Sequence, residues 1–145
     1  MPGEFDSIEW YGKGPGESYP DIPLSTVYGI FENRVKEMHE PYLRPQESGN
    51  RSEVRYMKVK NAEGAGLIAT ADKPFNFSAH RYTDDDFMLW KHREDVKDMG
   101  FTRISIDGFL SGIGSASCGP MPIEKYLLIS TETREFSFTL KPIKE

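Results

Sequence analysis

Short runs in which apolar and polar residues alternate, separated by glycine- and proline-rich turns, constrain the fold of this 145-residue chain more than any other feature. Alternation with a period of two places the apolar side chains on one face of a strand, and that face must be buried. Clear runs lie at Phe5–Tyr11, Val54–Lys60, Phe101–Phe109 and Glu135–Leu140. Many short strands joined by such turns predict an all-β (mainly β) fold, arranged as a β-sandwich with one short helix.

The remaining elements are read from local chemistry. Thr83 is expected to cap the helix, because the three aspartates that follow it suit the positive end of a helix dipole. The stretch Leu24–Met38 fits one helical face, but its β-branched and aromatic residues and Gly29 favour a strand through Phe31 or Val35, followed by a short turn. Three more short strands are predicted, at Leu67–Ala71, Phe75–Ser78 and Lys125–Ile129.

Charge and composition narrow the class of protein. The net charge of −5 and the absence of a basic run argue against nucleic acid or an anionic membrane as a partner. No apolar stretch is long enough to span a bilayer, and the first residues lack the pattern of a signal peptide. The single cysteine, Cys118, excludes an internal disulfide and fits a reducing compartment. We therefore expect one cytoplasmic domain, residues 1–145.

The segment His39–Arg51 carries an unusual density of hydrogen-bonding side chains for a connection between strands. Pro41 and Pro45 restrict its backbone, and Ser48–Asn50 supply turn chemistry. Such a segment is either a surface site or a polar network that pins neighbouring strands together. The network is the commoner arrangement, since Arg and Glu in turns mostly pair locally or face water.

A search for catalytic groups finds single candidate residues but no set of residues with the spacing of a known active site. His80 ends a strand and is the most interesting of the three imidazoles, and with Arg44 and Glu47 it forms the candidate polar site. No pair of histidines has metal-ligand spacing, so no metal site is predicted. Glu17, Glu47 and Asp107 are conceivable acids or bases, but nothing in the sequence pairs them. Cys118 is a conceivable nucleophile, although a lone loop cysteine is more often inert.

Four motifs in this order carry a family resemblance: Trp10–Asp21, Pro41–Arg51, Phe75–Tyr82 and Gly112–Pro120. Together they resemble the C-terminal portion of the large β-galactosidases of glycoside hydrolase family 2. The resemblance covers almost the whole chain. One departure is Ile22, where the family often has Arg. Met1 falls where the family's sequence continues upstream, so the chain is expected to be part of a longer polypeptide.

The resemblance implies a fold and a division of labour. In that family the terminal domain is a β-supersandwich similar to galactose mutarotase, and this chain corresponds to roughly its second half. The catalytic glutamates and the magnesium and sodium ligands of the family lie on a separate TIM-barrel domain. The resemblance therefore assigns no catalytic residue, no metal ligand and no cofactor to this chain.

The family's terminal domain also sends a loop to the rim of the sugar pocket. In one branch that loop ends in a Trp that stacks on sugar, and Cys118 stands at that position here. Cysteine cannot stack, so the resemblance implies only that Ser115, Ser117 and Cys118 shape the edge of the pocket.

We therefore expect a non-catalytic domain of a β-galactosidase (lactase) that hydrolyses terminal non-reducing β-D-galactose residues by a retaining mechanism. The expected partners are the TIM-barrel part of the chain, β-galactosides at the rim, and further copies in a homo-oligomer. An uncovered edge or apolar face would favour such self-association. One alternative is a free-standing carbohydrate-binding module whose stacking platform is drawn from Trp10, Trp90, Tyr42 and Tyr82. The other is a mutarotase-like epimerase that uses His80 and a carboxylate, which rests on fold analogy alone.

Overall fold

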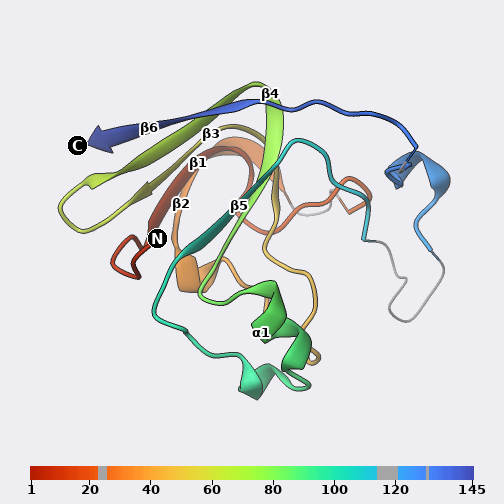
Figure 1. Cartoon of the computed structure of the whole chain (residues 1–145), viewed down its shortest axis with the longest axis horizontal. Helices are drawn as coiled ribbons and strands as arrows, with labels where there is room; N and C mark the ends of the chain where they lie inside the picture. The colour runs from red at the N-terminus through yellow and green to blue at the C-terminus, as the bar shows by residue number, and fades with distance from the viewer. Residues whose placement is uncertain (23–25, 114–120, 130) are drawn as a thin grey trace.

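The computed structural model describes residues 1–22, 26–113, 121–129 and 131–145, and β-strands dominate it (Figure 1). The strand fraction of 43% confirms the all-β class. The strands are β1 (Ser7–Gly14), β2 (Val27–Arg34), β3 (Arg51–Lys60), β4 (Ala65–His80), β5 (Arg103–Asp107) and β6 (Phe138–Lys144). One helix, α1 (Asp84–Leu89), and three 3₁₀ turns at Val35–Glu37, Arg93–Asp95 and Glu124–Tyr126 complete the elements.

All six strands belong to one antiparallel sheet with the order β2-β1-β3-β4-β5. The strand β4 is the longest and has two partners on the side away from β3. Its first part, Ala65–Ala71, pairs with β6, and its last part, Asn76–His80, pairs with β5. The described residues thus form a single curved sheet, and its place as half of a supersandwich stays a prediction.

Two features of the sheet differ from the sequence-based expectation. The runs on either side of Pro74 form one continuous strand, β4, instead of two. Proline is tolerated there because Asp72–Pro74 is where β4 changes partners, and no residue of that step has a partner in the ladder. The strand predicted at Lys125–Ile129 is wrong, since a 3₁₀ turn covers Glu124–Tyr126.

Several local predictions are confirmed. The strand in Leu24–Met38 is β2, and a 3₁₀ turn follows it directly. The side-chain oxygen of Thr83 caps α1 by accepting a hydrogen bond from the backbone of Asp86. That capping geometry satisfies a donor that would otherwise be left free at the helix start.

The core lies on one face of the sheet and centres on Trp10, which is fully buried. The Trp10 ring lies 5.4 Å from the ring of Phe31 and 5.9 Å from that of Phe77, measured between centroids. Further apolar side chains from β1, β3 and β4 surround it: Ile8, Val54, Met57, Val59, Ala69, Phe75 and Ala79. The alternation correctly predicts that Ile8 and Trp10 are buried on one face. In β3 it is interrupted, because register shifts on both sides of Val54 place this residue on the same face as Met57 and Val59.

Replacing Trp10 by alanine is expected to lower the free energy of unfolding by about 3–5 kcal/mol, because it removes the largest buried side chain and leaves a cavity. Leu43, which is 81% exposed, is the matched control, and its replacement by alanine should change stability by less than about 0.5 kcal/mol. Denaturant titration of both variants measures the difference, and equal effects would contradict this description of the core.

Candidate functional site

The loop that follows β1 and the segment that leads into β3 are joined by buried hydrogen bonds. The backbone N–H of Ser18 donates to the carbonyl of Asn50 at 2.8 Å, and the Asn50 side chain donates back to the carbonyl of Ser18 at 2.6 Å. The backbone N–H of Ser52 donates to Ser18 Oγ at 2.9 Å. All three residues are buried, so each bond satisfies groups that would otherwise be costly to desolvate.

Glu17 extends this network. One of its carboxylate oxygens accepts from the Gly49 backbone N–H at 2.8 Å, and the other accepts from the Tyr42 hydroxyl. We call Glu17, Ser18, Tyr42 and Ser48–Ser52 the polar corner. The commoner arrangement considered for the segment His39–Arg51, a network that pins neighbouring strands, is therefore present.

Arg51 is the one charged side chain of the polar corner that is fully buried, at 1% exposure. Its guanidinium lies over the Trp10 ring, 5.4 Å from the centroid, and donates to the carbonyls of Gly49 and Asn50 at 3.0 and 3.3 Å. Burial lowers the pKa of Arg51, and the neighbouring carboxylates of Glu40 and Glu17 oppose that effect. The cation thus ties the polar corner directly to the core.

His80 lies beside the polar corner in a cluster of rings. Its imidazole stacks on Tyr82 with centroids 4.8 Å apart, and the Tyr82 hydroxyl forms a 2.8 Å hydrogen bond with His39 Nδ1. Ser48 Oγ lies 3.2 Å from the same His39 nitrogen. Because Ser48 is only 2% exposed and the rings are packed together, this Ser–His contact is a structural bond and not an accessible nucleophile with its base.

The environment of His80 keeps its imidazole neutral at neutral pH. Burial lowers its pKa to about 4, with further lowering from His39 and Arg103. Its Nδ1 atom is buried and has no hydrogen-bond partner among the described residues. A neutral, packed imidazole can orient neighbouring groups, but it is a poor proton donor at neutral pH.

Glu47 sits in a group of carboxylates. The Tyr19 hydroxyl donates to it at 3.3 Å. Desolvation raises the pKa of Glu47, and the negative charges of Asp84, Asp107 and Glu17 add to that rise. Desolvation also raises the pKa of Asp107. Like charges in one neighbourhood favour protonation because they repel one another.

One ion pair balances part of this charge. Arg103 makes two contacts with the Asp84 carboxylate, one of them 2.6 Å from Nη2 to Oδ2. These hydrogen bonds lower the pKa of Asp84 and raise that of Arg103. Sequence reasoning missed this pair, because the start of the helix already explained the aspartates of α1.

The structure therefore brings together only two of the three residues of the predicted polar site. Glu47 and His80 share the electrostatic neighbourhood of Asp84, as their pKa shifts show. Arg44 does not join them: it is exposed, and its only polar contact in the described structure is a 3.5 Å bond from Gln46 to its carbonyl. The predicted rim residues Ser115, Ser117 and Cys118 lie outside the described residues.

The aromatic platform expected of a carbohydrate-binding module is not present among the described residues. Trp10 is fully buried and Tyr82 is 5% exposed, whereas Tyr42 is 38% exposed. Trp90 is half-buried and packs edge-on against Tyr82, with centroids 5.2 Å apart, so these four side chains do not form one open stacking surface. Within the described residues no group of three metal-ligating side chains occurs either.

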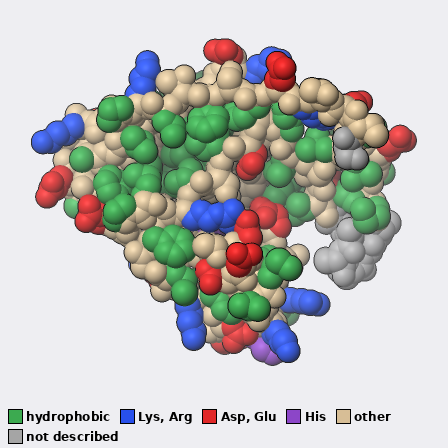
Figure 2. Space-filling view, viewed as in Figure 1, with side chains coloured by type: hydrophobic (Ala, Val, Ile, Leu, Met, Phe, Trp, Pro, Cys, Tyr) green, Lys and Arg blue, Asp and Glu red, His purple; other side chains and the backbone are tan. Residues whose placement is uncertain are grey.

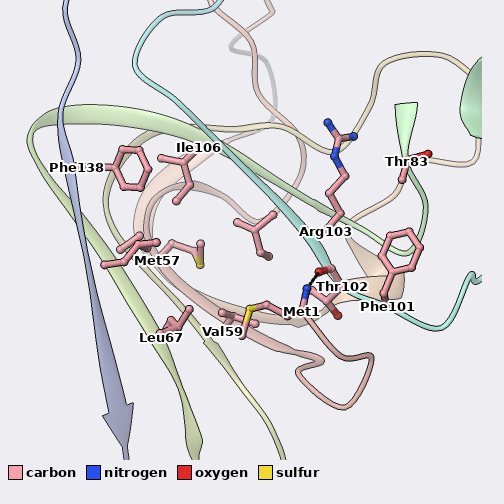
Figure 3. A pocket seen from close by; sticks show the side chains of 13 residues that line it. Met1, Met57, Val59, Leu67, Thr83, Phe101, Thr102, Arg103, Ile106 and Phe138 are labelled. Atoms are coloured by element: carbon pink, nitrogen blue, oxygen red, sulfur yellow. Dashed lines mark hydrogen bonds between the residues drawn. The ribbon is translucent and has the colours of Figure 1, made fainter. Parts of the chain in front are cut away.

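An apolar hollow of about 540 Å³ opens on the core face of the sheet. Hydrophobic side chains gather there between β5 and β6 (Figure 2). Met1 and Phe101 border the hollow. Apolar side chains from β3, β4, β5 and β6 form its walls: Met57, Val59, Leu67, Ala69, Ile104, Ile106, Phe138 and Leu140. Figure 3 shows Met57, Ile106 and Phe138 turned toward one another across the hollow. Phe138 and Leu140 remain 45% and 50% exposed, so this face is left uncovered.

No helix in the described part of the chain is both long and apolar enough to cross a lipid bilayer.

Comparison with known proteins gives a consistent result. The family model described as the beta galactosidase small chain matches residues 1–140. A β-galactosidase of Kluyveromyces lactis is 36% identical over 138 residues, which cover 92% of this chain and 13% of that protein. β-Galactosidases of Actinobacillus pleuropneumoniae and Staphylococcus xylosus are each 33% identical, over 88% and 97% of this chain. The chain spans only 12% and 14% of the length of these two relatives.

Gly49 is expected to tolerate no side chain. Its φ of +80° is unfavourable for other residues, and an added Cβ would overlap the carbonyl oxygen of Met38 and press on the His80 ring. Replacing Gly49 by alanine should lower the free energy of unfolding by about 2 kcal/mol or more. The control is Gly16, where an added Cβ meets nothing within 4 Å. A Gly49→Ala variant as stable as Gly16→Ala would contradict the geometry of the polar corner.

The lowered pKa of His80 predicts a specific pH dependence. Between pH 6.5 and 4 the unfolded chain binds a proton on this imidazole and the folded chain does not, so acid favours unfolding. Stability should fall by about 1–3 kcal/mol from this group as the pH drops through that window. Glu47 and Asp107, whose pKa values are raised, act in the opposite direction. Comparing the pH dependence of wild type and His80→Gln isolates the effect, and identical slopes would count against it.

Proposed function

This chain belongs to the β-galactosidase small-chain family, and we propose that it is a non-catalytic domain of a β-galactosidase that serves as a scaffold for the rest of the polypeptide. The whole enzyme hydrolyses terminal β-D-galactose residues by a retaining mechanism. The TIM-barrel portion supplies the two catalytic carboxylates and holds the magnesium and sodium ions. The present domain supplies packing surface, subunit contacts and, through Ser115, Ser117 and Cys118, part of the rim of the sugar site.

The apolar hollow is the observation that carries this proposal. Exposed apolar patches on soluble domains mark surfaces that another part of a protein covers. Phe138 and Leu140 project from β6 on the same face as Ala69, in direct continuation of the core. A sheet whose core face continues into an open hollow is suited to receive a second layer. The relatives are many times longer than this chain, so they contain ample polypeptide to provide that layer.

The chemistry of the polar corner agrees with a supporting role. Its carboxylate Glu17 is occupied by Tyr42 and Gly49, and its cation Arg51 is buried against Trp10. These groups are committed to holding loops in place and are not available to a substrate. The same reasoning weakens the epimerase alternative, because His80 is packed against Tyr82 and only 7% exposed.

The isolated chain is expected to show no turnover of a chromogenic β-galactoside. Measurable hydrolysis by the purified chain would overturn the non-catalytic assignment. Titration with galactose or lactose, followed by tryptophan fluorescence, tests the binding-module alternative. A saturable change at millimolar sugar would favour that module over a scaffold.

The scaffold role itself is tested by grafting this chain in place of the matching segment of the Kluyveromyces lactis relative. The graft should be active, and Leu140→Lys within it should lower activity, because a lysine on the hollow opposes the apolar layer that covers it. Met88→Lys on α1 is the matched control, since Met88 is 81% exposed and lies outside the hollow. Equal activity of the two variant grafts would contradict the proposed packing surface.

A further inference from the structure

The side chain of Asp21, in the loop after β1, contacts a segment that is far away in the sequence. The backbone N–H of Ile113 donates to Asp21 Oδ1 at 3.1 Å, across a separation of 92 residues. Ile113 is the last described residue before residues 114–120, the segment that carries the three proposed rim residues. Asp21 therefore holds the backbone at the point where the chain enters that segment.

The neighbouring residue, Gly112, allows this contact because it has no side chain. Gly112 is buried, and a Cβ added to it would lie 2.6 Å from Asp21 Cγ and 2.7 and 2.9 Å from the two carboxyl oxygens. Only glycine lets a backbone and another group approach so closely. An alanine at this position would push the carboxyl group of Asp21 away and break its hydrogen bond to Ile113.

Two further hydrogen bonds join the residues before and after the same segment. The backbone N–H of Gly112 donates to the carbonyl of Tyr126 at 2.7 Å, and the backbone N–H of Leu128 donates to Ser111 Oγ at 3.0 Å. The chain is thus bonded to itself across the segment. The contact from Asp21 ties these joined ends to the loop after β1.

The backbone that carries the Asp21 side chain is itself held in place. Asp21 lies in a tight turn, which is closed by backbone hydrogen bonds of 3.2 and 3.4 Å between Tyr19 and Ile22. Pro20 occupies the first of the two central positions of this turn and restricts φ there. Tyr19 is only 2% exposed, and it directly follows Ser18, which is bonded within the polar corner. The polar corner therefore fixes the position from which Asp21 reaches Ile113.

We propose that Asp21 is a positioning residue for the sugar site: by holding Gly112 and Ile113, it sets the place of the rim residues that follow and thereby the affinity for a β-galactoside. This inference rests on the proposed function, which makes Ser115, Ser117 and Cys118 the rim residues. Asp21 acts through the backbone and not by touching the sugar. Binding groups must be held closely in place, because a displacement of about 1 Å is enough to weaken their action.

The contact itself is tested in the full 145-residue chain by hydrogen exchange at the Ile113 amide. Asp21→Ala should speed exchange there by about tenfold or more, because the amide loses its acceptor. Gly112→Ala should do the same, whereas Asp21→Asn keeps a side-chain oxygen and should retain most of the protection. Gly16→Ala is the matched control, since a Cβ there meets nothing within 4 Å. Unchanged exchange in Asp21→Ala would overturn the proposal.

The effect on sugar affinity is tested in the graft into the Kluyveromyces lactis relative, with a chromogenic β-galactoside as substrate. Asp21→Ala and Gly112→Ala should each raise KM by about tenfold and leave kcat within about twofold, because they weaken binding without touching the reacting groups. A general loss of folded protein would lower the apparent kcat and leave KM unchanged. Asp21→Asn should bring KM back toward the wild-type value, and Gly16→Ala should not change it.

One further graft separates this inference from the proposed function. Replacing Ser115, Ser117 and Cys118 together by alanine should also raise KM, because these are the proposed rim residues. If that variant keeps the wild-type KM, the rim role is wrong and the positioning role of Asp21 is overturned with it. If that variant raises KM and Asp21→Ala does not, the rim role stands and only the positioning role of Asp21 is overturned.

Discussion

The buried guanidinium of Arg51 on the face of Trp10 is the contact on which the rest of this domain depends. A cation that is 1% exposed must be compensated, and here the compensation comes from the Trp10 ring and from the carbonyls of Gly49 and Asn50. Gly49, which supplies one of these carbonyls, adopts a positive φ of 80°. The Arg51 guanidinium, at the start of β3, is thus hydrogen-bonded to the turn that precedes this strand.

Hydrogen bonds connect that turn and its neighbours to two other parts of the domain. Toward β1, Asn50 and Ser52 hold Ser18 through four hydrogen bonds, so the glycine- and proline-rich loop is fixed without regular structure. Toward the end of β4, Ser48 meets His39, and His39 meets Tyr82. The polar corner is thus held by buried hydrogen bonds, while the core face stays open between β5 and β6.

Much of the sheet followed from local pattern. The alternation in Phe5–Tyr11 and Val54–Lys60 predicted two central strands, and the capping residue Thr83 predicted the one helix. Pro74 was misread because a proline breaks a strand only where its N–H is needed, and β4 changes partners at that residue. The run at Lys125–Ile129 has the composition of a strand, but a 3₁₀ turn covers its first part, and a single backbone hydrogen bond from Gly112 to Tyr126 does not make a ladder. A strand forms only where a second segment pairs with it, and the residues of one segment do not show whether such a partner exists.

The sequence by itself determined that this is an all-β domain, that its family is that of the β-galactosidases, and that the segment His39–Arg51 is a polar connection. Each of these rests on residue types and short spacings, which need no knowledge of distant contacts. Only the tertiary structure decided that Glu47 and His80 share one neighbourhood while Arg44 is exposed, that Asp84 pairs with Arg103, and that β2 stands at the edge of the sheet. These facts arise where segments far apart in the chain are packed together, because charge, burial and free edges depend on which surfaces meet.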